Sequence, residues 1–150
     1  MKRSLLISLL LLATGAVPAQ AAERRLWATV NVCDTELHPN QIGIRAALPE
    51  RRAGRVVTLR FRVQYRDDEG RWRWVRDADS GWRKAGRSSE SGWSFEVAAE
   101  GSRILRGVVG YRWSRKGRVV RRARRVTEVG HPSTVGADPE DFSAATCRIE

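Results

Sequence analysis

A stretch of alternating tryptophan and arginine contains the residue types in this sequence that best suit ligand binding. Residues 71–76 read Arg-Trp-Arg-Trp-Val-Arg, and Trp82 follows shortly after them. Indole rings stack on sugars and bases, and guanidinium groups hold anions, so this composition is typical of a surface that binds sugars or single strands. Trp72, Trp74 and Trp82 are therefore the candidate stacking residues. The competing interpretation is packing, with at least one of Trp72 and Trp74 covering a sheet edge. The remaining tryptophans, Trp27, Trp93 and Trp113, are expected in the core.

The arginine-rich segment 118–125, Arg-Val-Val-Arg-Arg-Ala-Arg-Arg, is a second candidate. Successive side chains of a strand point to opposite faces, so this segment places arginine on both faces. A central strand could not bury so many charges, and we therefore expect an edge strand. Two roles remain open, because charged edges resist pairing with other chains and clustered arginine attracts polyanions. The candidate polyanion patch consists of Arg115, Arg118, Arg121, Arg122, Arg124 and Arg125, with Arg106 and Arg112 reinforcing it across the expected hairpin.

Residue types suited to catalysis or metal binding are sparse. Asp34 and His38 lie near Cys33 in sequence, and His131 precedes a Ser/Thr loop, so a hydrolytic trio can be drawn from these residues, but no GxSxG, HExxH or paired-carboxylate signature supports it. The acidic turn 67–70, Asp-Asp-Glu-Gly, lacks the alternating oxygen ligands of a calcium-binding loop. We therefore predict no enzyme activity, no catalytic residue, no metal and no cofactor.

The two cysteines, Cys33 and Cys147, lie near opposite ends of the chain. In an exported protein, an even pair without a CxxC motif predicts a disulfide. Zinc needs about four ligands, and these cysteines together with His38 and His131 lack the paired spacing of a zinc site. We expect a Cys33–Cys147 bond that ties the C-terminal tail to the body of the domain.

The elements that must position these residues are β-strands. Over residues 56–66, apolar side chains at 57, 59, 61, 63 and 65 alternate with polar ones, which predicts one buried and one solvated face. Further strands are expected at 26–33, 42–46, 72–75, 80–85, 93–97, 104–113 and 118–126, followed by a loop over 130–146. About seven short strands separated by turns predict an all-β fold, an immunoglobulin-like or fibronectin-like β-sandwich, with a β-barrel as the alternative.

Residues 1–21 have the order of parts of a secretory signal peptide. Met1-Lys2-Arg3 is positively charged, residues 5–12 are almost entirely apolar, and Ala19-Gln20-Ala21 has the small-x-small pattern of a cleavage site. The apolar run is shorter than the roughly 20 residues that cross a bilayer. We expect export by the general secretory route with cleavage after Ala21. Residues 22–150 would then form a single β-sandwich domain without a transmembrane segment, secreted or associated with the cell envelope.

The charge of the chain is strongly positive. It carries 28 Lys and Arg against 17 Asp and Glu, a formal net charge of +11, and all the cations except Lys2, Lys84 and Lys116 are arginine. Arginine binds phosphate and carboxylate bidentately, which suits a binding role. A high-GC genome also favours arginine over lysine, so composition alone leaves both explanations open. The net charge itself attracts polyanions.

Four segments together resemble a group of exported proteins from high-GC bacteria. They are residues 30–35 (Val-Asn-Val-Cys-Asp-Thr), 59–65 (Leu-Arg-Phe-Arg-Val-Gln-Tyr), 105–109 (Leu-Arg-Gly-Val-Val) and 143–147 (Ser-Ala-Ala-Thr-Cys). The resemblance extends over nearly all of residues 22–150. It implies an exported domain closed by a disulfide, and it implies no activity, because none is established for that group.

The leading hypothesis is an exported, non-enzymatic protein that binds acidic polysaccharide or another envelope or extracellular polyanion through arginine charge and tryptophan stacking. The alternatives are a surface protein–protein interaction module and a small hydrolase whose site has no sequence signature. Export argues against nucleic acid as the partner. Salt distinguishes the first two, because polyanion binding weakens steeply with ionic strength and an apolar interface does not.

Overall fold

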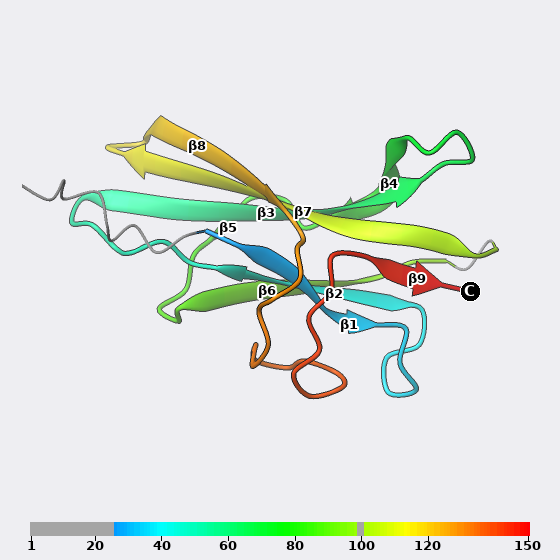
Figure 1. The fold of residues 1–150 in the computed structure, drawn as a ribbon. Helices are drawn as coiled ribbons and strands as arrows, with labels where there is room; N and C mark the ends of the chain where they lie inside the picture. The colour runs from blue at the N-terminus through cyan, green and yellow to red at the C-terminus, as the bar shows by residue number, and fades with distance from the viewer. Residues whose placement is uncertain (1–25, 99–100) are drawn as a thin grey trace, which may run out of the picture.

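The computed structural model describes residues 26–98 and 101–150, so the predicted signal peptide lies outside the described residues. The described residues form nine β-strands joined by turns and loops (Figure 1). The strands are β1 (Ala28–Cys33), β2 (Gln41–Ala47), β3 (Arg55–Arg66), β4 (Trp72–Asp79), β5 (Arg83–Lys84), β6 (Glu90–Glu96), β7 (Arg103–Arg115), β8 (Arg118–Val126) and β9 (Cys147–Ile149). None of the described segments is a helix that could cross a membrane.

The strands build two antiparallel sheets that pack face to face (Figure 1). The smaller sheet has the order β1-β2-β6, and the larger has the order β4-β3-β7-β8, with β5 paired to β3 and β9 paired to β7. The chain crosses between the sheets after β2, before β6 and after β6. This arrangement corresponds to strands A-B-E and C-F-G of an immunoglobulin-like sandwich, with β4 and β5 added beside C. The predicted all-β sandwich is confirmed, and the sheets do not close into the alternative barrel.

The pairing of β3 with β7 forms the centre of the larger sheet. Its register runs without interruption from Arg55 opposite Arg115 to Tyr65 opposite Leu105. Phe61 on the inner face is only 1% exposed, whereas the side chain of Arg62 on the other face is 31% exposed. The two-faced strand predicted from the alternating sequence is therefore confirmed. We call the face of the larger sheet that is turned away from β1, β2 and β6 the outer face.

The core fills the space between the two sheets. Ile42 and Ile44 of β2 face Phe61, Val109 and Tyr111 of the larger sheet, and all five are almost completely buried. The Tyr111 hydroxyl donates a hydrogen bond to the carbonyl oxygen of Ala47 at 3.1 Å, so its polar atom is satisfied inside the core. Burial raises the pKa of the Tyr111 phenol above its ordinary value.

The disulfide predicted between Cys33 and Cys147 is present, with 5.3 Å between the two Cα atoms. It joins the end of β1 in the smaller sheet to the start of β9 in the larger sheet. The bond therefore ties the two layers together at one edge instead of crossing the middle of the core, where the disulfide of immunoglobulin domains joins strands B and F.

Several element boundaries differ from the sequence prediction. β4 extends to Asp79, and its pairing with β3 has an irregularity between Arg62 and Gln64. The region expected as a loop over 130–146 is anchored to β1 by bridges at Ala144 and Asp138. The final strand β9 has only three residues, too few for an alternating pattern to reveal it.

Candidate functional site

The outer face of the larger sheet brings together residues from four strands. Opposite Gln64 of β3 lie Trp74 of β4 on one side and Arg106 of β7 on the other. Further along, Arg112 of β7 is paired with Arg122 of β8. Paired residues in adjacent strands point to the same face, so tryptophan from the β4 edge and arginine from the central strands share one surface.

Three tryptophans on this face each lie under an arginine guanidinium. The guanidinium carbon of Arg62 is 3.4 Å from the ring centroid of Trp74, and that of Arg106 is 4.0 Å from the centroid of Trp72. Arg112 lies 3.7 Å from the centroid of Trp82. All three distances are within the range of attractive cation–π contacts. We call these six residues the Arg–Trp cluster: Trp72, Trp74, Trp82, Arg62, Arg106 and Arg112.

The ring of Trp82 lies against the backbone of the sheet. A Cβ atom on Gly110 would be 3.2 Å from the ring of Trp82, so the indole rests directly on a strand position that has no side chain. Trp74 extends from the β4 edge and is 41% exposed, and Arg124 of β8 also reaches within 5.6 Å of its centroid. Trp82 therefore lies along the sheet surface, and Trp74 is still open to solvent.

The acidic side chain of Asp79 lies beside the Arg–Trp cluster. Asp79 accepts two hydrogen bonds from Nε of Arg60, the shorter at 2.7 Å, and lies 3.7 Å from Nε of Arg62. The hydrogen bond from Arg60 holds the pKa of Asp79 below its ordinary value. This carboxylate is thus shared between two arginines and offsets only part of the local positive charge.

The arginines of the outer face are close enough to affect one another. Burial, followed by the charges of Arg60 and Arg124, lowers the pKa of Arg62. Burial and the charge of Arg124 likewise lower the pKa of Arg106. Nε of Arg112 is buried and has no hydrogen-bond partner among the described residues. An anion placed on this face would relieve the mutual repulsion.

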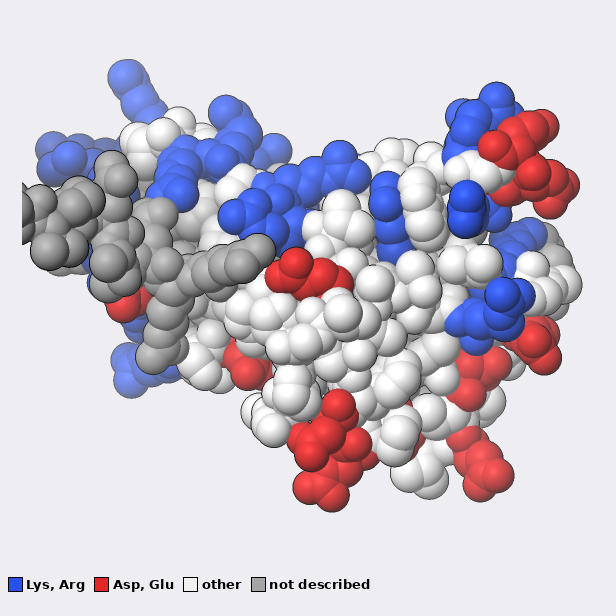
Figure 2. All heavy atoms as spheres, viewed as in Figure 1, with Lys and Arg blue, Asp and Glu red and all other residues white. Residues whose placement is uncertain are grey.

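Positive charge is concentrated in the larger sheet. Asp77 and Asp79 are the only acidic residues within its strands, whereas β3, β4, β5, β7 and β8 each contain at least two Arg or Lys. Figure 2 shows blue side chains along the β8 side, red ones over the loops on the opposite side, and a mixed cluster at the β3–β4 turn. The molecule therefore presents a basic sheet on one side and acidic loops on the other.

The structure divides the arginine-rich segment between two faces. β8 is an edge strand, as predicted. Arg122 and Arg124 lie on the outer face, opposite Arg112 and Gly110. Arg121 and Arg125 lie on the other face, where Arg121 is 4.8 Å from the centroid of Trp113 and Arg125 donates to the Leu26 carbonyl oxygen. Arg115 and Arg118 flank the β7–β8 turn. The six candidate patch residues thus do not form one continuous surface.

The tryptophans expected in the core differ in burial. Trp113 is buried at 5% exposure, as predicted. Trp93 is half-buried under the guanidinium of Arg83, at 3.8 Å. Trp27 is also half-buried and stacks on the imidazole of His131, with centroids 4.4 Å apart. The core assignment of these last two residues is therefore only partly correct.

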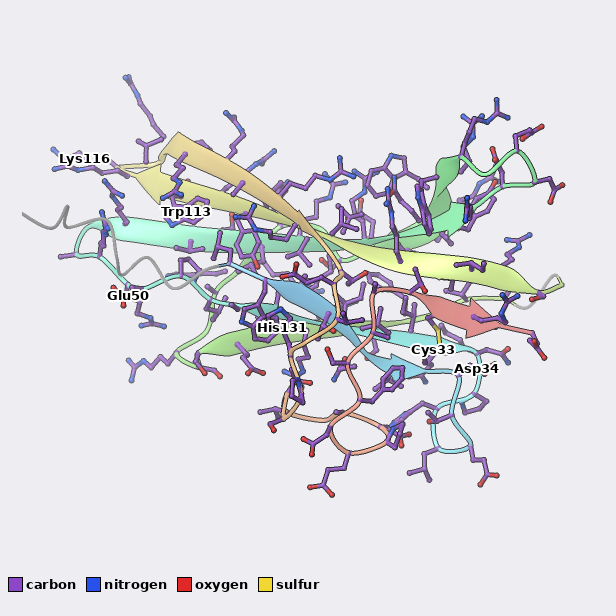
Figure 3. The ribbon with its side chains drawn as sticks, viewed as in Figure 1. Cys33, Asp34, Glu50, Trp113, Lys116 and His131 are labelled. Carbon is purple, nitrogen blue, oxygen red and sulfur yellow. A yellow bond between two sulfur atoms is a disulfide. The ribbon has the colours of Figure 1, made fainter. Side chains whose placement is uncertain are left out.

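The residues considered for a hydrolytic trio are not brought together. The Asp34 carboxylate caps its own loop by accepting a hydrogen bond from the Asn40 amide at 2.7 Å. His131 is 3.1 Å from a carboxylate oxygen of Glu128, and Figure 3 shows it well separated from Asp34. In the described part of the chain, no group of three or more His, Cys, Asp or Glu could hold a metal ion. In the acidic turn 67–70, the Asp67 carboxylate forms ion pairs with Arg71 and Arg73.

Sequence reasoning did not identify Arg62 as a site residue, although it placed this side chain on the solvated face of its strand. The signal available was the alternation Arg60, Arg62 and Gln64 along β3, which becomes informative only once β4 is known to lie beside it. No protein-family model, curated protein or solved structure matches the chain.

Proposed function

We propose that this protein is an exported, non-catalytic binding protein whose Arg–Trp cluster holds an acidic polysaccharide or another polyanion of the cell envelope or extracellular space. The observation that carries the proposal is the stacking of Arg62, Arg106 and Arg112 on three tryptophans of one open sheet face. A guanidinium stacked on a ring keeps the N–H groups at its edge available for the oxygens of a carboxylate or sulfate.

The two residue types have complementary roles in this proposal. The guanidinium groups bind the acidic substituents, and the exposed part of an indole such as Trp74 contacts the ring of the adjacent sugar. The site is a sheet surface that spans the three strands β4, β3 and β7, which suits an extended chain contacted at several repeats. Many weak contacts along a polymer add up when its repeats engage neighbouring arginines.

Export is the second part of the proposal. The Cys33–Cys147 bond supports it, because disulfides persist mainly in oxidising compartments outside the cytoplasm. The signal-like segment 1–21 supports the general secretory route, with a mature chain that starts at Ala22. A secreted or envelope-associated location would place the basic sheet among the acidic polymers to which it is proposed to bind.

The test is the salt dependence of binding to heparin and to polygalacturonate, a sulfated and a carboxylated polymer. The variant R62Q/R106Q/R112Q removes the guanidinium groups of the Arg–Trp cluster. The control R76Q/R115Q/R118Q removes the same charge from exposed positions outside it. We expect the first variant to lose more affinity, and its affinity to fall less steeply with salt, because each contacting arginine contributes to the slope. Equal losses in both variants would show a diffuse basic surface and contradict the proposal.

A second variant separates the contribution of tryptophan stacking to the affinity from the contribution of charge. Trp74→Ala leaves the net charge unchanged, so the slope with salt should stay the same while affinity falls at every salt concentration. An unchanged affinity would mean that the tryptophan only supports Arg62 and does not contact the polymer.

For the edge strand β8 we infer a separate role, protection of the sheet edge, which a comparison of self-association between variants can test. Val119 and Val120 are 37% and 54% exposed on this unpaired edge, and arginine surrounds them. Charged side chains on an edge discourage pairing with another copy. If R121S/R122S/R124S/R125S self-associates in size-exclusion chromatography while R62Q/R106Q/R112Q stays monomeric, the arginines of β8 protect the edge.

A further inference from the structure

A groove at one end of the sandwich is lined by a second group of cations. It lies between residues 48–57, which lead into β3, and residues 84–89, which connect β5 to β6, and it has a volume of about 840 Å³. Its charged lining residues are Arg51, Arg52, Arg55, Lys84, Arg87 and Glu50. Glu50 marks this end in Figure 3, on the far side of the molecule from Cys33.

Three of these cations have no side-chain partner among the described residues. The side chains of Arg55, Lys84 and Arg87 make no hydrogen bond or ion pair with any described residue. Arg51 donates a hydrogen bond to the carbonyl oxygen of Gly86, which links the two walls of the groove. Like charges around a concave space focus the electric field into it and attract an anion.

We propose that this groove is a second anion site, separate from the Arg–Trp cluster, that takes a compact, multiply charged phosphate group. The three unpartnered cations come from both walls, so one bound group must satisfy several donors at once. A phosphate offers three or more acceptor oxygens and up to two negative charges, whereas a carboxylate offers two oxygens and one charge. The volume lies in the range of about 300–1,000 Å³ that is usual for small-ligand sites.

The groove opens beside the outer face. Lys84 of β5 and Arg112 of β7 are both paired with Thr58 of β3, on opposite sides of it. Lys84 thus lines the groove and is also in register with Arg112, a member of the Arg–Trp cluster. The phosphate can therefore belong either to a free small molecule or to the end of a polymer that continues onto the sheet.

The first experiment titrates the exported, disulfide-bonded protein with pyrophosphate, and with acetate at the same ionic strength, by calorimetry. The groove variant is R55Q/R87Q, and the matched control is R76Q/R118Q, which removes two exposed arginines that do not line the groove. We expect pyrophosphate binding to weaken by about tenfold or more in the groove variant, the effect of losing at least one charge-assisted hydrogen bond, and to change much less in the control. Equal weakening in both variants, or equal binding of acetate, would overturn the proposal.

Two further measurements keep the result decisive. Thermal unfolding checks that the variants fold, and R87Q alone serves if the double variant does not, because Arg87 lies in a loop outside the strands. The variant R62Q/R106Q/R112Q should bind pyrophosphate normally even if it fails to bind heparin, so the two sites can fail independently. Loss of pyrophosphate binding in that variant would place the phosphate on the Arg–Trp cluster and contradict a separate site.

Titration with short linear polyphosphate distinguishes the two possible sources of the phosphate group, a free small molecule and the end of a polymer. If the groove takes the end of a polymer, polyphosphate should bind more tightly than pyrophosphate, and only this gain should disappear in R62Q/R106Q/R112Q. If the groove takes a free small molecule, both should bind equally and both should depend on Arg55 and Arg87.

Discussion

Gly107 of β7 is a strand residue of the larger sheet that lies tightly against buried side chains, including Ile44 of the smaller sheet. A Cβ atom there would lie 2.7 Å from Cδ1 of Ile44 in β2 and 2.7 Å from Cγ2 of Thr127. Both neighbours are buried, so neither can move aside without disturbing the core.

We predict that Gly107→Ala lowers the free energy of unfolding by about 1–3 kcal/mol, the usual effect of overpacking a core. Urea denaturation followed by tryptophan fluorescence measures it. Gly86→Ala is the matched control, because a Cβ at Gly86 meets nothing within 4 Å. A loss of stability no larger at Gly107 than at Gly86 would mean that the sheets are farther apart in solution.

For single residues, the sequence predicts which residue types form the candidate site better than it predicts which side chains contact one another. Trp72, Trp74 and Trp82 were selected because tryptophan and arginine alternate around them, and all three do lie under guanidinium groups. The partner of Trp72 is Arg106, from the far side of β3. Such a pair depends on strand order, which no local pattern contains.

The β3–β4 hairpin shows how an element with a polar turn is held together. Asp67 accepts hydrogen bonds from the backbone amide of Arg71 at 2.7 Å and from Nε of Arg73 at 3.0 Å. Partial burial opposes ionisation of this carboxyl, but the hydrogen bonds from Arg71 and Arg73 outweigh it and lower its pKa from 3.8 to about 2.

A depressed carboxyl pKa stabilises the folded state above the ordinary pKa of the group, and this contribution is lost as the pH falls through the folded value. The contribution of Asp67 should therefore be complete above about pH 4 and disappear as the pH approaches about 2. We predict that NMR titration of the Asp67 carboxyl gives a midpoint near 2, and that Arg73→Ala moves it toward 3.8. A midpoint near 3.8 in the unmodified protein would show that the turn is open in solution.

The long strands were predictable from the sequence. β3, β7 and β8 have nine or more residues each and were expected within two residues of their bounds. Short elements were less predictable, because β5 has two residues and β9 has three. These elements exist because long neighbours offer them hydrogen bonds: β5 pairs with β3, and β9 pairs with β7.

On the scale of the whole molecule, the disulfide closes nearly the entire domain. Cys33 and Cys147 are 114 residues apart in sequence, and a loop of this length restricts the unfolded chain strongly. In the chain-entropy model such a bond contributes about 4–5 kcal/mol, a large part of the 5–15 kcal/mol that is usual for the stability of a domain.

We therefore predict that reduction, or Cys33→Ser combined with Cys147→Ser, lowers the free energy of unfolding by about this amount. Urea denaturation with and without reductant measures the difference. Two free thiols in the purified exported protein, found by alkylation and mass mapping, would contradict the bond.

The separation of charge also belongs to this scale. The larger sheet is basic, and the loops that carry Asp34, Glu36, Asp138, Glu140 and Asp141 are acidic. A protein with this distribution turns its basic side toward a polyanion as it approaches, and salt weakens the effect. The net charge was evident from composition, but its distribution over one sheet depends on which strands become neighbours.

The most direct test of polyanion binding by the Arg–Trp cluster is an NMR titration of the protein with a short acidic oligosaccharide, observed at the six indole N–H signals. The account predicts that the signals of Trp72, Trp74 and Trp82 shift together and saturate, with the Nε–H signals of Arg62, Arg106 and Arg112. Those of Trp27, Trp93 and Trp113 should stay in place, because these residues lie outside the outer face. Shifts confined to the β7–β8 turn, or spread evenly over all six tryptophans, would contradict it.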